Sequence, residues 1–134
     1  MFFQLSAKAE YGLMMLKHLA ALKPKELGCL RSIAKEQNLP IKFLERIASD
    51  LLKAGLVISQ PGSAGGYRLK KSANQIKLSE ILSALGEDVT PTVCKHDGNC
   101  CKRQSACPNK TGWLKVQKDL AKIINAYRLS DLIN

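Results

Sequence analysis

The stretch from residue 30 to residue 70 constrains the fold most, because two amphipathic segments and a turn-rich hairpin pattern follow one another directly. Apolar residues recur at helical spacing over 30–37 and again over 41–54. A short turn at 38–40 separates the two segments, and Gly55 is a suitable helix stop. The pattern predicts two helices joined by a tight turn, which is a helix-turn-helix.

A β-hairpin is predicted immediately after the second helix. Residues 56–60 and 67–70 have strand propensity, and the segment 61–66 between them is rich in proline and glycine. Glycines at such a tip permit close approach of the backbone to a phosphate. A hairpin in this position is a wing, so we expect a mainly α fold with a small β-hairpin wing, that is, a winged helix-turn-helix domain.

Two further amphipathic segments flank this unit. Residues 6–23 are predicted to form a helix with Ser6 as its N-cap, and residues 78–86 to form a shorter one. The expected domain therefore spans residues 1–88. The apolar face of its first helix is expected to contain Tyr11, Met14, Met15, His18, Leu19 and Leu22.

The charge balance favours a polyanionic partner. Lysine and arginine number 21 against 11 acidic residues, which gives a formal net charge of +10. The chain shows no nucleophile–base pair and no phosphate-binding glycine motif beside a lysine. We therefore expect neither catalysis nor a small-molecule substrate.

Four of the five cysteines lie in one loop-like stretch, C-K-H-D-G-N-C-C-K-R-Q-S-A-C, at residues 94–107. No apolar run approaches the ~20 residues of a membrane span, and the start of the chain does not resemble a signal peptide. We predict a cytoplasmic protein with no membrane partner. In that compartment clustered cysteines indicate a metal or redox site more often than disulfides. The predicted cysteine-rich loop covers residues 89–110.

Residues 111–131 are predicted to form one long helix within a dimerisation unit at 111–134. Its apolar residues recur with gaps of three and four, close to a coiled-coil seam. Packing of this seam on its own domain and packing against a second copy are both open, and we favour the second copy. The seam consists of Trp113, Val116, Leu120, Ile123, Ile124 and Tyr127.

Several short motifs occur together along the chain: K-A-E-Y-G-L at 8–13, L-E at 44–45, K-A-G-L-V at 53–57, G-G-Y at 65–67, the cysteine loop, Trp113 and L-S-D-L at 129–132. In this order they resemble the bacterial winged-helix regulators typified by IscR, NsrR and CymR. The resemblance implies a homodimer that binds a palindromic double-stranded DNA operator. It also implies an iron–sulfur cluster, with 2Fe-2S favoured over 4Fe-4S.

The resemblance also implies a ligand set for that cluster. Cys94, Cys101 and Cys107 match its three cysteines, with Cys100 as the alternative to Cys101. For the fourth ligand, IscR-like members use a histidine where this chain has Lys110. NsrR-like members use a carboxylate at the position of Glu10, which is the expected fourth ligand here. His96 in the loop is a less favoured substitute.

Expected DNA contacts follow from the matched positions. Arg46 is expected to pair with guanine and Glu45 with cytosine, beside Lys42 in the major groove. Contacts to the DNA backbone are expected from Arg31, Lys53, Ser63 and Tyr67. Pro61 stands where family wings often carry an arginine, so a minor-groove contact is in doubt. Cys29, outside the loop, is expected to be buried or half-buried.

The sequence therefore predicts a regulator that senses redox, nitric oxide or iron status through its cluster. Two alternatives stay open. The cysteines could bind zinc or form disulfides as a thiol switch in a cluster-free regulator. The chain could instead carry electrons or clusters, with the winged helix serving protein contacts.

Overall fold

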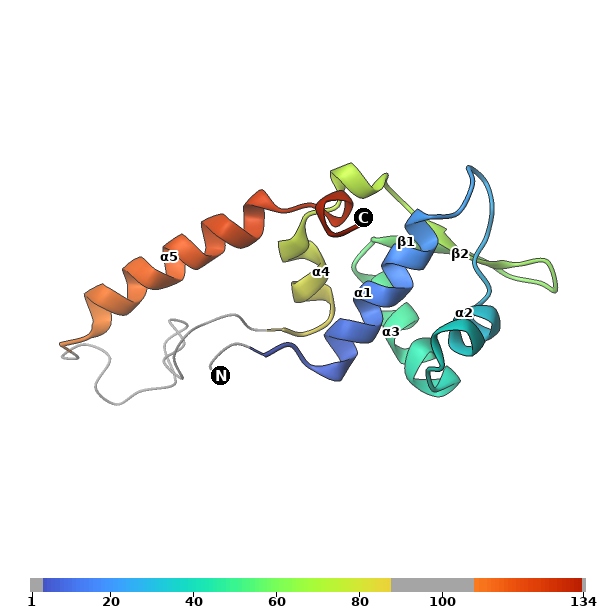
Figure 1. The fold of residues 1–134 in the computed structure, drawn as a ribbon, viewed down its shortest axis with the longest axis horizontal. Coiled ribbons are helices and arrows are strands. Elements are labelled where there is room, and N and C mark those ends of the chain that lie inside the picture. Colours follow the sequence, from blue (N-terminus) through green and yellow to red (C-terminus); the bar gives the residue numbers. More distant parts are fainter. Residues whose placement is uncertain (1–3, 88–107, 134) are drawn as a thin grey trace.

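The computed structural model describes residues 4–87 and 108–133. Figure 1 shows a winged-helix body from which one long helix projects. No helix in the described ranges is both long and apolar enough to cross a membrane. The elements are α1 (Ala7–Ala20), α2 (Leu30–Gln37), α3 (Ile41–Lys53), β1 (Val57–Gln60), β2 (Gly66–Leu69), the 3-10 turn η1 (Ala73–Gln75), α4 (Leu78–Ala84), α5 (Lys110–Ala126) and the 3-10 turn η2 (Leu129–Leu132).

Local sequence signals set the ends of the first three helices. The Ser6 hydroxyl accepts a hydrogen bond from the Ala9 N–H at 3.1 Å and so caps α1. Asn38 ends α2 in the left-handed conformation, with φ of 53°. Gly55, with φ of 75°, ends α3 in the same way and directs the chain into β1. These predicted boundaries are confirmed, but α1 ends at Ala20 rather than at the predicted residue 23.

The core forms where α1 packs against α2, α3 and β2. Met15 and Leu19 of the predicted α1 face are buried, but Gly12 and Leu16 are buried beside them. His18 was expected on the inner face, yet it is only half-buried and its Nδ1 lies 3.4 Å from the Glu36 carboxylate. The buried face is shifted because α1 contacts helices on two sides. The other fully buried large side chains include Ile33, Leu44, Ile47, Leu51, Leu56, Ile76, Ile81 and Leu129.

The wing is an antiparallel pair, with Val57 opposite Leu69 and Gln60 opposite Gly66. Tyr67 also exchanges two backbone hydrogen bonds with Gly28, at 2.7 and 2.9 Å. The loop before α2 therefore adds a third, strand-like contact to the wing. This contact holds the hairpin against the same end of the body as α2 (Figure 1).

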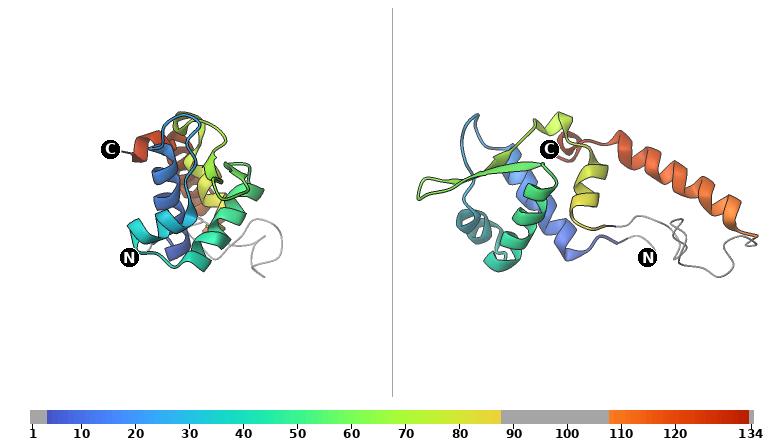
Figure 2. Two further views of the ribbon diagram at one scale, coloured as in Figure 1. Left: turned by 90° about the vertical axis from the view of Figure 1, so that its right-hand side faces the viewer. Right: turned by 180° about the vertical axis from the view of Figure 1, so that it is seen from behind.

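The long C-terminal helix is shorter than predicted. It ends at Ala126 rather than near residue 131, because Tyr127 turns the chain into an extended conformation. The Tyr127 carbonyl accepts the Leu78 N–H, and the buried Leu129 donates its N–H to the Ile76 carbonyl. These tertiary bonds return the chain end to the core. Helix α5 and the wing consequently project from opposite ends of the body (Figures 1 and 2).

Candidate nucleic-acid interface

The outer face of α3 carries four of the predicted DNA contacts. Its buried residues recur at intervals of three and four, and this spacing leaves the opposite face to solvent. Residues that are three, four, seven or eleven positions apart along a helix share one face. Lys42, Glu45, Arg46 and Lys53 are all exposed there. The structure thus brings these four residues onto one helix surface.

The other predicted contacts lie on α2 and the wing. Arg31 is exposed in the first turn of α2, and Ser63 is exposed at the tip of the hairpin. Tyr67 is half-buried and packs against the core while its backbone bonds to Gly28. Tyr67 therefore anchors the wing to the body, and its contact with DNA stays a prediction.

Two basic residues of the predicted wing, Arg68 and Lys70, were not among the predicted contacts, and both are exposed. Arg68 is exposed on β2 and lies opposite Ile58 in the strand pairing. It makes no ion pair within the part of the chain that the structure describes. The alternation of inward and outward residues along a strand could have identified it. Arg68 gives the wing a cation although Pro61 occupies the usual arginine position.

An ion pair ties the inner flank of α3 to α1. The Lys8 Nζ lies 2.5 Å from the Asp50 Oδ2. The pKa of Asp50 is held below its ordinary value, chiefly by this bond to Lys8 and further by the charges of Lys53 and Arg46. Asp50 therefore stays ionised under ordinary conditions and offsets part of the positive charge at this end of α3.

Cys29 is exposed, so the expectation that it is buried or half-buried was wrong. It occupies the N-cap position of α2, where the chain runs along the surface between the Gly28 bridge and the helix. The thiol makes no capping hydrogen bond. Backbone N–H groups of Ser32 and Arg31 nevertheless lower its pKa, because they favour the thiolate.

The chain just before the cysteine loop is held at the N-terminus of α1. Glu87 is the last described residue before the loop. A glycine turn at the end of α4 sets the position of Glu87, and the Glu87 N–H donates to the Leu82 carbonyl at 2.8 Å. Glu87 Oε1 accepts the Ser6 N–H at 3.0 Å and also the Ser6 hydroxyl. Glu10, the predicted fourth ligand, is exposed one helical turn beyond Ser6.

The predicted cysteine ligands Cys94, Cys100, Cys101 and Cys107, with His96, lie outside the described residues. Among residues 4–87 and 108–133, no three His, Cys, Asp or Glu side chains lie close enough to hold a metal. Lys110 begins α5. Of the predicted cluster ligands, Glu10 is the one that lies on a described element.

The apolar seam of α5 is largely open. Trp113, Val116, Ile123 and Tyr127 are 42%, 41%, 57% and 47% exposed. One seam residue, Ile124, instead faces α4, where it lines a small apolar hollow together with Ala121 and Asn125. Packing on its own domain thus accounts for only part of the apolar surface of α5.

Comparison with known proteins decides the family. Residues 5–134 match the family model Rrf2, described as an iron-dependent transcriptional regulator. The chain belongs to the Rrf2 family. The resemblance seen in the sequence motifs is thereby confirmed, as is the expectation of a DNA-binding transcriptional regulator rather than an enzyme.

Relatives of this Rrf2 protein match over nearly its whole length. Protein rrf2 of Nitratidesulfovibrio vulgaris is 31% identical over 130 residues, which cover 97% of this chain and 87% of the relative. The transcriptional regulator IscR of Cronobacter sakazakii is 31% identical over 131 residues, which cover 98% of this chain and 80% of the relative.

Solved structures confirm the winged-helix fold of this Rrf2 protein. CymR of B. subtilis, titled the global cysteine regulator, superposes with a TM-score of 0.74 at 29% identity, covering 97% of this chain and 95% of CymR. IscR of T. potens superposes with a TM-score of 0.73 at 30% identity, and the match covers 97% of this chain and 85% of that IscR. The five helices and the two-stranded sheet of the described residues match both regulators.

The structure explains most of the motif K-A-E-Y-G-L in this Rrf2 protein. Tyr11 meets the edge of Phe43 on α3, with ring centroids 5.5 Å apart at 83°. Gly12 lies under Leu85, the C-cap residue of α4, since a Cβ there would fall 2.5 Å from the Leu85 Cδ1. Glu10 alone makes no side-chain contact of this kind within the described residues.

Proposed function

We propose that the chain is a cytoplasmic, homodimeric operator-binding regulator that senses redox, nitric oxide or iron status through an iron–sulfur cluster. One observation carries the proposal. The cysteine loop follows Glu87, which is bonded to the N-cap residue Ser6 of α1, and it precedes α5, whose apolar seam is largely open. A group assembled in that loop would join the DNA-binding body to the dimer helix.

The exposed face of α3 supports direct reading of DNA. Arg46 would pair with guanine, Glu45 would accept from cytosine, and Lys42 would lie beside them in the major groove. Arg31, Lys53, Ser63 and Tyr67 would contact the backbone. Two such faces must be about 34–36 Å apart to engage both half-sites of an operator. A dimer through α5 would set that separation.

The ligands we assign are Cys94, Cys101 and Cys107, with Cys100 as the alternative to Cys101. The exposure of Glu10 and its place one turn from the Ser6–Glu87 contact fit a fourth ligand. In Figure 1 the start of α5, which follows Cys107, lies well away from the first turn of α1. This separation favours Glu10 of the second protomer as the ligand. The bound group, favoured as 2Fe-2S, would supply a centre that oxidants or nitric oxide can alter.

Anaerobic purification tests the cluster directly. We expect a brown protein with stoichiometric iron and sulfide and a visible spectrum typical of a cluster. Cys107→Ser should lose most of the iron, whereas Cys29→Ser, a matched change outside the loop, should retain it. A colourless wild-type protein without iron would contradict the proposal.

A thiol switch is the second candidate, and a specific observation favours it. Cys29 is exposed with a lowered thiol pKa, and the oxidized form of Staphylococcus aureus CymR superposes on this chain with a TM-score of 0.71 at 29% identity. Oxidant-dependent DNA binding by an iron-free protein would support this alternative. Stoichiometric zinc would support the zinc form. An electron or cluster carrier would instead lack salt-dependent, sequence-selective DNA binding.

A further inference from the structure

The first turn of α1 holds two elements that are far apart in the sequence. Ser6 gives both its N–H and its hydroxyl to the carboxylate of Glu87, at the start of the cysteine loop. Two residues later, the Lys8 ammonium binds Asp50 on α3. One helical turn thus contacts both the root of the loop and the helix that carries the predicted base contacts.

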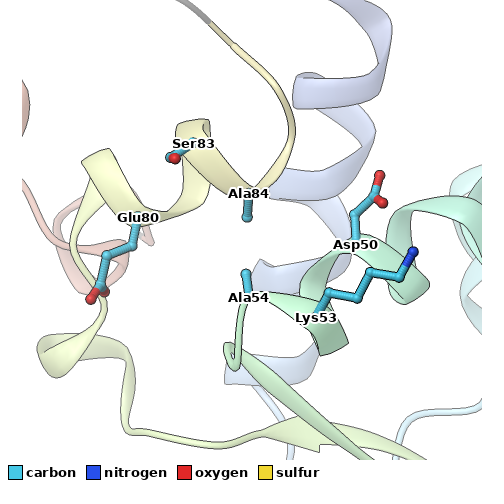
Figure 3. Close-up of a pocket in the computed structure, with 6 residues that line it drawn as sticks. All are labelled: Asp50, Lys53, Ala54, Glu80, Ser83 and Ala84. Atoms are coloured by element: carbon cyan, nitrogen blue, oxygen red, sulfur yellow. The ribbon is translucent and has the colours of Figure 1, made fainter.

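Helix α3 contacts α1 more extensively than it contacts α4. A shallow depression separates the two helices, and Figure 3 shows Ala54 of the α3 end facing Ala84 of α4 across it. The charged side chains around the depression, Asp50 and Glu80 among them, extend away from this gap (Figure 3). Helix α1 therefore orients this end of α3 more than α4 does.

The contacts from α1 also run along the length of α3. Lys8 binds Asp50 near the end of α3, while Tyr11 packs on Phe43 near its start. A rotation or shift of α1 would consequently move both ends of α3, the proposed recognition helix, together. The negative carboxylate of Glu87 lies at the N-terminus of α1, where the helix dipole favours it.

We propose that Glu87 and Asp50 are positioning residues that couple the root of the cysteine loop to the recognition helix through Ser6 and Lys8. The use of this coupling for sensing rests on the proposed cluster. The mechanical link itself can be tested without the cluster, so the two ideas can fail separately.

Hydrogen exchange on the cluster-free protein tests the link. In Glu87→Ala we expect the amides of residues 47–53 in α3 to exchange at least about threefold faster, because α1 is no longer held. This acceleration should disappear when Lys8→Met is already present, since the second contact is then broken. Glu26→Ala is the matched control, because Glu26 also accepts a backbone N–H, from Lys23, but on the loop after α1.

Faster amide exchange that is confined to α1 would overturn the proposed coupling of Glu87 to α3. The same holds if Glu87→Ala accelerates exchange in α3 just as much when Lys8→Met is present. Glu87→Gln retains an acceptor for Ser6 and should show a smaller effect than Glu87→Ala. If Glu87→Ala does not fold, the Glu87→Gln and Lys8→Met pair makes the same comparison.

Operator affinity then tests the use of the link for sensing. We expect the affinity ratio between cluster-loaded and cluster-free protein to fall by at least about threefold in Lys8→Met, with the visible spectrum unchanged. Lys71→Met is the matched control, because Lys71 and Glu80 form an ion pair of similar exposure outside α1 and α3. A ratio unchanged in Lys8→Met would overturn the role in sensing. A wild-type ratio of one would overturn the cluster-sensing proposal and leave the exchange result to decide the link.

Discussion

Single residues of the wing are constrained by backbone contacts within the protein. A Cβ on Gly66 would lie 2.6 Å from the Gly28 carbonyl oxygen, and one on Gly65 would lie 2.0 Å from the Gln60 carbonyl oxygen. Neither carbonyl can move without breaking strand pairing or the Gly28–Tyr67 bridge. The G-G-Y motif is thus required for packing the wing on the body, apart from any approach to phosphate.

Gly66→Ala should lower the free energy of unfolding by about 2 kcal/mol, because the added methyl group must displace the Gly28 backbone. Chemical denaturation at one fixed protein concentration measures the change. Gly112→Ala is the contrasting variant, since nothing lies within 4 Å of its Cβ and the residue is helical. It should be neutral or stabilising by up to about 1 kcal/mol. Equal effects of the two variants would contradict the packing argument.

The Cys29 thiol should react with iodoacetamide at lower pH than an ordinary cysteine. Its pKa is lowered by the backbone N–H groups of Ser32 and Arg31, so the thiolate fraction rises earlier as pH increases. Peptide mapping of alkylation against pH measures this, with the denatured chain as the control. A folded-state titration at or above that of the denatured chain would refute the assignment.

At the scale of elements, α5 has one surface that packs on α4 and another that is open to solvent. Ala121 and Ile124 face α4, while Val116 and Ile123 remain open. Ile123→Glu should raise the dimer dissociation constant by at least about 100-fold, or about 3 kcal/mol, because a charge would be buried against the second copy. Lys118→Glu places the same charge on the opposite side of the helix and should leave the constant unchanged. Sedimentation velocity over a concentration series measures both, and a monomeric wild-type protein would contradict the prediction.

The ion pair between α1 and α3 should stabilise the fold only above acidic pH. The pKa of Asp50 is lowered in the folded state, so its contribution is complete above the unfolded value of about 3.9 and is lost as pH falls through the folded value. Both side chains are about a third exposed, which limits the contribution to less than about 1 kcal/mol. The difference in unfolding free energy between wild type and Lys8→Met should therefore be present at pH about 6 and absent at pH about 2. A difference that persists at the lower pH would refute the electrostatic origin.

At the scale of the whole molecule, local patterns predicted the elements, and distant contacts decided the rest. The ends of α2 and α3 followed from Asn38 and Gly55, whose conformations depend on a few neighbouring residues. The early end of α5 did not, because it depends on bonds from Tyr127 to Leu78, about fifty positions away along the chain. The Ser6–Glu87 contact spans 81 positions and no periodicity indicates it. Alternation along β2 did contain the signal for Arg68.

In the candidate site, too, local patterns predicted what depends on neighbouring residues and missed what depends on distant contacts. Helical periodicity correctly placed Lys42, Glu45, Arg46 and Lys53 on the exposed face of α3. The exposure of Cys29 was mispredicted, because it depends on the bridge between Gly28 and the wing. That bridge forms only in the folded chain.

The central claim is that a cluster in the loop sets the spacing of two recognition helices. Fluorescence anisotropy under anaerobic conditions, with one selected operator and both forms of the wild-type protein, tests it most directly. We predict operator affinities that differ by at least about tenfold between the cluster-loaded and cluster-free forms, which corresponds to about 1.4 kcal/mol. Equal affinities for the two forms would contradict the account.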